Sequence, residues 1–249
     1  MRLFTFLFFS LFSISSFSQI LNVESLRKVT DTTGWSGSAS IDFTLQRSVN
    51  DFFIIANDIH VQYKLTKHLF LLKNQLRFVK IEGENFSNNG ITHFRYNYKW
   101  KPKITWEAFV QGQYNKVSKI DLRLLVGIGP RFKLSKLENY KFYLGTLVMY
   151  EHEELSDGSV TSRDFRGSAY FSFSMYPNKI FSFISTTYYQ PLLSNIGDYR
   201  IASESSMGVK AFKNFTIKIT YLFTYDSEPA IDIQNSQYRF ATGISYSFN

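Results

Sequence analysis

Residues Asn214–Tyr225 read NFTIKITYLFTY, and their side chains alternate in character. The odd-numbered positions are apolar or aromatic, namely Phe215, Ile217, Ile219, Tyr221, Phe223 and Tyr225. Polar residues stand between them at Thr216, Lys218, Thr220 and Thr224. Because successive side chains of a β-strand point to opposite faces of a sheet, this pattern predicts a strand with one apolar face and one polar face.

The same alternation recurs from residue 34 to the end of the sequence. About twelve such segments follow one another, each roughly ten to fourteen residues long, which is near the length that a tilted strand needs to cross a bilayer. Their predicted starts are Gly34, Asp51, Lys67, Gly90, Lys103, Lys119, Tyr140, Ser162, Lys179, Asp198, Asn214 and Ser236. Residues 34–249 are therefore predicted to form an all-β, antiparallel, up-and-down transmembrane β-barrel of about twelve strands.

The alternative is a soluble secreted binding barrel or β-sandwich whose aromatic face forms its core. The chain has 26 Phe and 16 Tyr in 249 residues, so almost every strand would send large rings into that core and overpack it. Aromatic residues also gather at both ends of the predicted strands, as the two interfaces of a membrane favour. Tryptophans lie at one end (Trp35, Trp100, Trp106) and tyrosines at the other (Tyr150, Tyr189, Tyr199, Tyr225, Tyr238). These observations favour a barrel surrounded by outer-membrane lipids.

The N-terminal residues predict export. Arg2 is followed by a short apolar run and then by small residues at Ser16 and Ser18, which is typical of a secretory signal peptide over residues 1–18. Residues 19–33 show no alternation and are predicted to be a periplasmic N-terminal segment. The sequence has no cysteine, which excludes a lipoprotein anchor, disulfides and thiolate metal sites. We expect the protein in the outer membrane of a Gram-negative bacterium.

The connections between the predicted strands alternate in length. An even number of strands returns both termini to the periplasm, where short turns are expected. Candidates for these turns are 66–68, 101–103, 176–179 and 212–214, while 133–139 is longer than a tight turn should be. The predicted outer loops 82–89, 152–161 and 226–235 are longer and acidic.

Charged residues occupy the polar face of many predicted strands, which in a barrel is the lumen. This set comprises Arg95, Lys99, Glu107, Asp121, Arg123, Lys141, Glu151, Asp164, Arg166, Arg200, Glu204, Lys210, Lys218 and Arg239. One interpretation is that opposite charges pair across neighbouring strands and fill the lumen. The other is a solute path whose basic excess favours anions. We favour the first, because long side chains can obstruct a barrel of about twelve strands.

Other candidate chemistry is weaker. Gly127-Ile128-Gly129 is followed by Pro130 rather than by a helix, so close strand contact explains it better than a phosphate loop. The four histidines (His60, His68, His93, His152) belong to no local pattern of nucleophile, base and orienting residue. Carboxylates at Glu151, Glu153, Glu154 and Asp157 match no calcium-loop spacing, so we expect no metal and no cofactor. The net charge of +8 would favour binding to nucleic acid, but an exported protein rarely encounters nucleic acid, so we expect no such partner.

The sequence ends Ala241-Thr242-Gly243-Ile244-Ser245-Tyr246-Ser247-Phe248-Asn249. Gly243, Tyr246 and Phe248 resemble the C-terminal strand signal that the outer-membrane assembly machinery reads, in which aromatics follow a glycine by three and five positions. Two positions depart from it, because Ala241 stands where a polar residue is usual and Asn249 follows the last aromatic. This resemblance implies that the assembly machinery is a partner.

A second resemblance covers residues 109–134. Phe109–Asn115, Ile120–Arg123 and Gly127–Phe132 resemble a hairpin of a family of uncharacterised outer-membrane barrels, domain of unknown function 481, often labelled salt-induced outer membrane protein. The order of segments from Gly34-Trp35 to the last aromatic strand extends the resemblance over nearly the whole mature chain. The family provides no catalytic residue or ligand to transfer.

Together these patterns predict a non-enzymatic outer-membrane barrel, a monomer that acts in envelope or osmotic adaptation or as a narrow solute pore. The alternatives are an outer-membrane lipid hydrolase and the soluble secreted binding barrel.

Overall fold

A computed structural model describes residues 33–47, 51–81, 84–137, 139–156, 158, 161–212, 215–230 and 232–246. Its strands form one twelve-stranded sheet. The first six strands are β1 (Gly34–Arg47), β2 (Asp51–Lys64), β3 (His68–Ile81), β4 (Glu84–Lys101), β5 (Ile104–Asn115) and β6 (Ile120–Lys133). The other six are β7 (Tyr140–Leu155), β8 (Thr161–Met175), β9 (Phe181–Pro191), β10 (Tyr199–Phe212), β11 (Phe215–Asp226) and β12 (Ser236–Tyr246). The all-β prediction and its strand number are confirmed.

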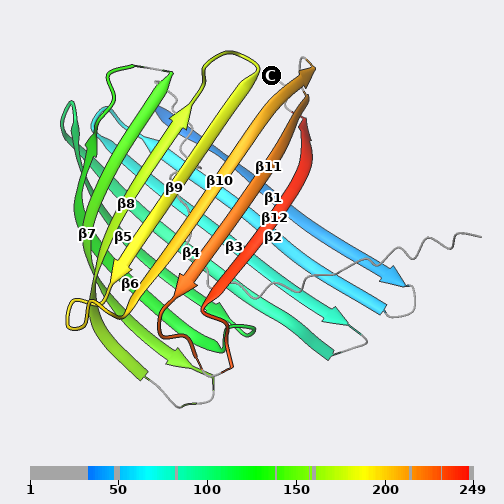
Figure 1. The fold of residues 1–249 in the computed structure, drawn as a ribbon. Coiled ribbons are helices and arrows are strands. Elements are labelled where there is room, and N and C mark those ends of the chain that lie inside the picture. Colours follow the sequence, from blue (N-terminus) through cyan, green and yellow to red (C-terminus); the bar gives the residue numbers. More distant parts are fainter. Residues whose placement is uncertain are drawn as a thin grey trace, which may run out of the picture.

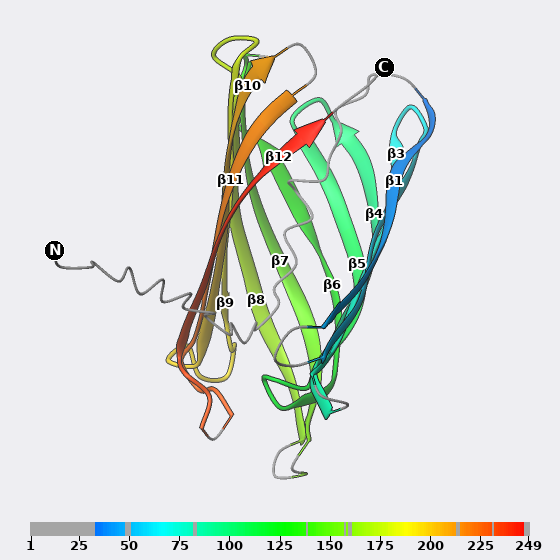
Figure 2. The same cartoon turned by 90° about the vertical axis from the view of Figure 1, so that its right-hand side faces the viewer.

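The strands form an up-and-down barrel. Each strand pairs with the next one along the chain, and every recorded ladder is antiparallel. The sheet curls so that its edge strands β1 and β12 return to the same side (Figures 1 and 2). A ladder between β1 and β12 is not among those recorded for the described residues.

The two ends of the barrel are named here by their connections. The turn end carries the start of β1, the end of β12 and the connections β2–β3, β4–β5, β6–β7, β8–β9 and β10–β11, and it lies uppermost in Figure 1. The loop end carries the other connections, including the long β9–β10 and β11–β12 loops. The turn end is the end for which the sequence predicts a periplasmic location.

Strand β4 is longer than the alternation predicts. The sequence indicated a start at Gly90, but β4 begins at Glu84, so most of the predicted loop 82–89 is strand. Residues 84–89 pair with the end of β3 from Arg77 to Ile81. Asn85, Ser87 and Asn88 are all polar, so the segment lacks the alternation that marks a strand in the sequence, although its backbone continues the ladder.

The outer wall is apolar and the interior is polar. Val126 and Val148 are 51% and 50% exposed, whereas Arg123 and Glu151 on the same two strands are 3% and 2% exposed. A soluble barrel would show the reverse, with its apolar rows buried and its charges on the surface. The soluble alternative is therefore wrong, and the apolar wall is the surface that lipid would cover.

The tryptophans and a group of tyrosines lie at the two ends of this wall. Trp35, Trp100 and Trp106 are exposed at the turn end. At the loop end, the ring of Tyr199 lies 5.6 Å from those of both Tyr189 and Tyr225, measured between centroids. Amphipathic rings at two levels bound an apolar band, as they do in membrane barrels.

Within the described residues, no helix is long and apolar enough to cross a membrane.

Three sequence predictions concern residues that are not described. The predicted signal peptide (1–18) and all of the predicted N-terminal segment (19–33) except its last residue lie outside the described ranges. Of the predicted assembly signal, Phe248 also lies outside them, whereas Gly243 and Tyr246 belong to β12. Tyr246 pairs with Phe215 of β11 at the turn end.

An arginine on the apolar wall tests the membrane assignment. We expect Val148→Arg to lower the free energy of unfolding in lipid vesicles by about 2–4 kcal/mol, because the charge would lie in hydrocarbon, whereas Leu134→Arg at the turn end should cost about 1 kcal/mol or less. Urea titration of the vesicle-folded protein measures both values. Equal costs at the two positions would contradict a hydrocarbon layer around the middle of the strands.

Candidate functional site: the charged lumen

Glu107 is the centre of a cluster of ion pairs in the lumen. Its carboxylate lies 3.3 Å from Nη1 of Arg131 and 3.6 Å from Nη1 of Arg95, and it accepts a 2.6 Å hydrogen bond from the hydroxyl of Tyr170. These four residues, the central cluster, come from β4, β5, β6 and β8. Glu107 is fully buried, so its charge depends on these partners. The cluster connects strands that are not all neighbours in the sheet.

A glycine in the wall makes room for Tyr170. A Cβ atom at Gly145 would overlap the Tyr170 ring, so the ring lies against the inner face of β7 where only glycine fits. Gly127 does the same for the ring of Phe109. The Gly127-Ile128-Gly129 motif is thus explained by close packing: a Cβ at Gly129 would overlap the backbone of β7 at Thr146.

A row of amides and one imidazole continues from the central cluster towards the loop end. The Nε of Arg95 lies 3.2 Å from Nε2 of His93, whose Nδ1 lies 2.9 Å from Oε1 of Gln111. The amide of Gln111 then donates to Gln113 at 2.7 Å. The His93 ring also stacks on Phe109, with centroids 5.3 Å apart. This side of the lumen is filled by polar side chains that bond to one another.

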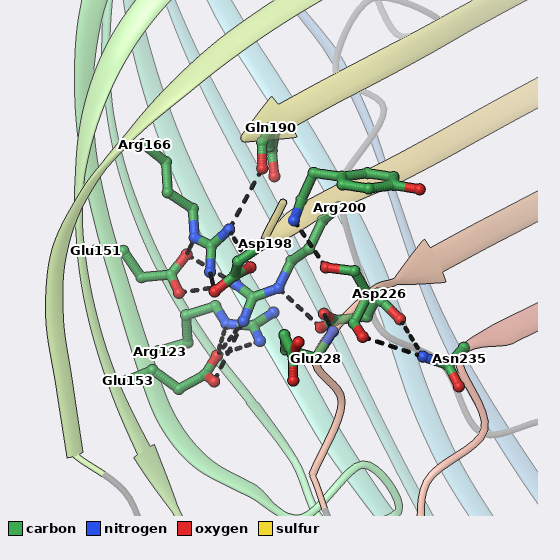
Figure 3. A network of polar contacts seen from close by, with 12 residues as sticks. Arg123, Glu151, Glu153, Arg166, Gln190, Asp198, Arg200, Asp226, Glu228 and Asn235 are labelled. Atoms are coloured by element: carbon green, nitrogen blue, oxygen red, sulfur yellow. Dashed lines mark hydrogen bonds and ion pairs between the residues drawn. The ribbon is translucent and has the colours of Figure 1, made fainter. Parts of the chain in front are cut away.

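A second and larger network, the loop-end network, lies nearer the loop end (Figure 3). Arg200 is its hub: Nη1 lies 2.7 Å from Glu151, Nη2 lies 3.3 Å from Glu153, and Nε lies 2.8 Å from Asp226. These carboxylates come from β7 and β11, on either side of the hub strand β10 in the sheet order. One guanidinium therefore joins distant parts of the wall with all three of its nitrogens.

Two further arginines complete the loop-end network. Arg166 of β8 forms a two-pronged pair with Asp198, at 2.9 and 3.2 Å, and lies 3.4 Å from Glu151. Arg123 of β6 pairs with Glu153. Bidentate guanidinium–carboxylate pairs fix geometry as well as charge, so this network holds the strands at set positions around the lumen.

The space inside the barrel narrows at its centre. Between the two groups of charges, a cavity of about 30 Å³ is lined by residues that include Arg95, Phe109 and Tyr170. A cavity of about 380 Å³ lies at the loop end and one of about 460 Å³ at the turn end. The cavity between the two groups of charges thus has room for only one or two water molecules.

The structure distributes the predicted lumen residues over three places. Six of them are buried within the two clusters and Asp164 is half-buried beside the loop-end cavity. The buried members are Arg95, Glu107, Arg123, Glu151, Arg166 and Arg200. The others are outside the clusters: Lys141 and Glu204 are half-buried, and Lys99, Lys210 and Arg239 are exposed. The side chain of Lys218 is not among those described.

Asp121 is not in the lumen network. It is exposed, because the ladder between β6 and β7 shifts register between Ile120 and Leu122 and skips Asp121. The bulge moves Ile120 to the inner face, where it is 4% exposed. Counting every second residue back from Arg123 places Asp121 on the inner face, because such a count cannot detect an inserted residue.

Five network residues were not in the predicted lumen set. They are Arg131, Glu153, Tyr170, Asp198 and Asp226. Arg131 and Tyr170 were detectable, because each lies an even number of residues from a predicted lumen arginine on its own strand, Arg123 and Arg166. Asp198 stands at the start of a predicted strand, two residues from Arg200, but β10 begins at Tyr199 and Asp198 lies in the loop before it.

The acidic segment 151–154 is divided between the two faces of β7. Glu151 and Glu153 face the arginines inside, while Glu154 lies 2.9 Å from Nε2 of His152. Alternation places Glu154 on the opposite face from Glu151 and Glu153, and these two are held by arginines. The fourth candidate carboxylate, Asp157, lies outside the described residues. Among the described residues, no group of three or more His, Cys, Asp or Glu side chains is placed to hold a metal ion.

The sequence matches one protein-family model. The match covers residues 30–248, and the family's description is Protein of unknown function, DUF481. The chain belongs to this family. The match confirms the resemblance drawn from residues 109–134, but it carries no function and does not test the salt-induced label. No curated protein matches the chain.

Solved structures with a similar fold are outer-membrane barrels. The NanC porin is 13% identical, with a TM-score of 0.50, and the match covers 86% of this chain and 98% of the porin. The KdgM porin is also 13% identical, with a TM-score of 0.45 and coverage of 85% and 100%. At this identity the NanC likeness concerns the fold alone, and it supports a β-barrel fold for this DUF481 protein.

Removal of the central carboxylate tests the cluster. We expect Glu107→Ala to lower the free energy of unfolding by about 3–5 kcal/mol, because two arginines would lose their buried partner. Glu154→Ala, at a carboxylate that is 47% exposed, is the control and should cost about 1 kcal/mol or less. Urea unfolding in vesicles measures both, and a small effect at Glu107 would show that water reaches the cluster and screens it.

Proposed function

We propose that this protein is a non-enzymatic barrel of a Gram-negative outer membrane with a narrow lumen that passes, at most, water and small ions. The observation that carries the proposal is the central cavity of about 30 Å³ between two much larger cavities. A solute of any size would have to displace the side chains of the central cluster.

The ion pairs support a filled lumen rather than an open path. Glu107, Arg95 and Tyr170 are each less than 5% exposed, so they are packed against other groups instead of lining free water. Moving any one of them would leave a charge or a hydroxyl without its partner in a confined interior. Thermal motion of a single side chain is therefore too costly in free energy to open this lumen.

The loop end is also partly covered. The β11–β12 loop contributes Glu228, Ala230 and Ile233 to the lining of the loop-end cavity. Asp232 of this loop lies 3.4 Å from Nζ of Lys119 in the β5–β6 connection, half of the sheet away in strand order. The pair is solvent-exposed and contributes about 1 kcal/mol or less, so it positions the loop weakly across the mouth.

The histidines support a non-enzymatic role. His93 bonds to Gln111 and Arg95, and His68 lies 2.7 Å from the hydroxyl of Tyr96. His152 pairs with Glu154. These contacts anchor the rings within strands, and nothing observed favours the lipid hydrolase that the sequence left open.

Single-channel recording in planar bilayers tests the proposal. We expect small conductance for the native protein and a several-fold increase for the triple variant Arg95→Ala/Glu107→Ala/Arg131→Ala, which removes the ion pairs without leaving an unpaired charge. Val148→Ala, on the outer wall, is the control and should conduct like the native protein. Phe109→Ala provides a second way to widen the centre if the triple variant does not fold.

Two results would contradict the narrow lumen. One is a large, steady conductance of the native protein. The other is a folded triple variant or Phe109→Ala variant whose conductance equals that of the control, since the removed side chains would then not be the obstruction.

A further inference from the structure

Lysines surround the turn end of the barrel. Four of its five connections carry or border an exposed lysine, namely Lys67, Lys101, Lys103, Lys136 and Lys179, and Lys210 lies two residues before the end of β10, near the fifth. The sequence of these connections contains one carboxylate, Glu138, which lies outside the described residues. Positive charge therefore collects around one mouth of the lumen.

The two large cavities differ in charge. The described residues that line the loop-end cavity include three arginines, each paired with a carboxylate there, and five carboxylates in all. Those that line the turn-end cavity include Lys179 and Lys210 and no carboxylate. The lumen thus has an acidic excess at one mouth and a basic one at the other, and the basic cavity attracts anions.

Three of the residues that line the turn-end cavity, Ser182, Lys210 and Thr216, lie on the inner face of the barrel, while Ile180 and Phe181 also line it. Lys210 pairs with Thr216 across β10 and β11, and Ser182 pairs with Gly208 across β9 and β10. These positions lie an even number of residues from Thr186, Arg200 and Thr224, which are buried on the inner face. A ligand in this cavity would be a solute in the mouth of the barrel rather than a lipid headgroup.

The lining provides hydrogen-bonding groups beside the two ammonium groups. The amides of Asn139 and Asn178, the phenol of Tyr176 and the hydroxyls of Ser182 and Thr216 line the same cavity of about 460 Å³. Lysine is a compact point charge that suits phosphate and carboxylate oxygens, and hydroxyls and amides donate to the same oxygens. The cavity is several times larger than a single phosphate, so it accommodates a group with more than one anionic centre.

We propose that the turn-end cavity is a binding site for a small multivalent oxyanion, a solute that carries several phosphate or carboxylate groups, with Lys179 and Lys210 as its charged contacts. The site lies outside the central constriction. Binding therefore does not require passage through the lumen and does not depend on the proposed narrow pore.

Calorimetry on the full-length protein in neutral detergent tests this site, with tripolyphosphate as the phosphate probe and citrate as the carboxylate probe. We expect at least one of them to bind at low salt and to bind more weakly as salt is added, because counterions screen the lysines. Lys179→Gln/Lys210→Gln should weaken this binding about ten-fold or more, since two charge-assisted contacts are lost. Lys116→Gln, at an exposed lysine of the loop end, is the matched control and should leave binding unchanged.

The probes separate the possible outcomes. Preference for tripolyphosphate or for citrate assigns the anion as phosphate or carboxylate within the proposed class. Absence of binding by both probes, equal binding by the double variant and the control, or binding to vesicles of anionic lipid in place of both solutes would each overturn the proposal. Because the assay needs no conduction, these results are distinct from those of the bilayer recordings.

Discussion

The fold depends on where charge can be placed in a strand that crosses hydrocarbon. Alternate side chains of such a strand point to opposite faces, so a charged residue has access to the interior at every second position and at no other. In this chain the valines of β6 and β7 face outward while Arg123 and Glu151 face inward. A slip of one residue between strands would exchange these faces, so the register is fixed by the cost of a charge in lipid.

Placing the charges inside creates a second requirement. The lumen is too narrow to hydrate them all, so each buried carboxylate needs a cation within reach. Glu107 is held by two arginines and a tyrosine, and Arg200 of β10 joins carboxylates from the neighbouring strand β11 and from the distant strand β7. The pairs that neutralise the interior also brace the wall and reduce the central space to a small cavity. The same ion pairs thus stabilise the barrel and obstruct its lumen.

The sequence predicted the features that follow from alternation. The strand number, the apolar outer wall and the inward arginines 95, 123, 166 and 200 all follow from a period of two. It was less informative where the backbone departs from that period: the bulge at Asp121, the polar start of β4, and the loop residue Asp198. The partners of each arginine also lay beyond prediction, because Tyr170 reaches Glu107 across strands that are not neighbours, and only the curvature of the sheet brings them together.

The most direct test of the inside-out arrangement uses the absence of native cysteine, which makes every introduced cysteine a unique site for a spin label. Labels placed one at a time along β8 in lipid vesicles would report collisions with oxygen, which dissolves in the membrane, and with a water-soluble nickel complex. The account predicts high oxygen accessibility at Phe165, Ala169 and Phe171 and low accessibility at Ser168 and Ser172. The account would be contradicted if labels at the two serines collided with oxygen as often as labels at the aromatic positions. It would also be contradicted if oxygen accessibility did not alternate from one residue to the next along β8.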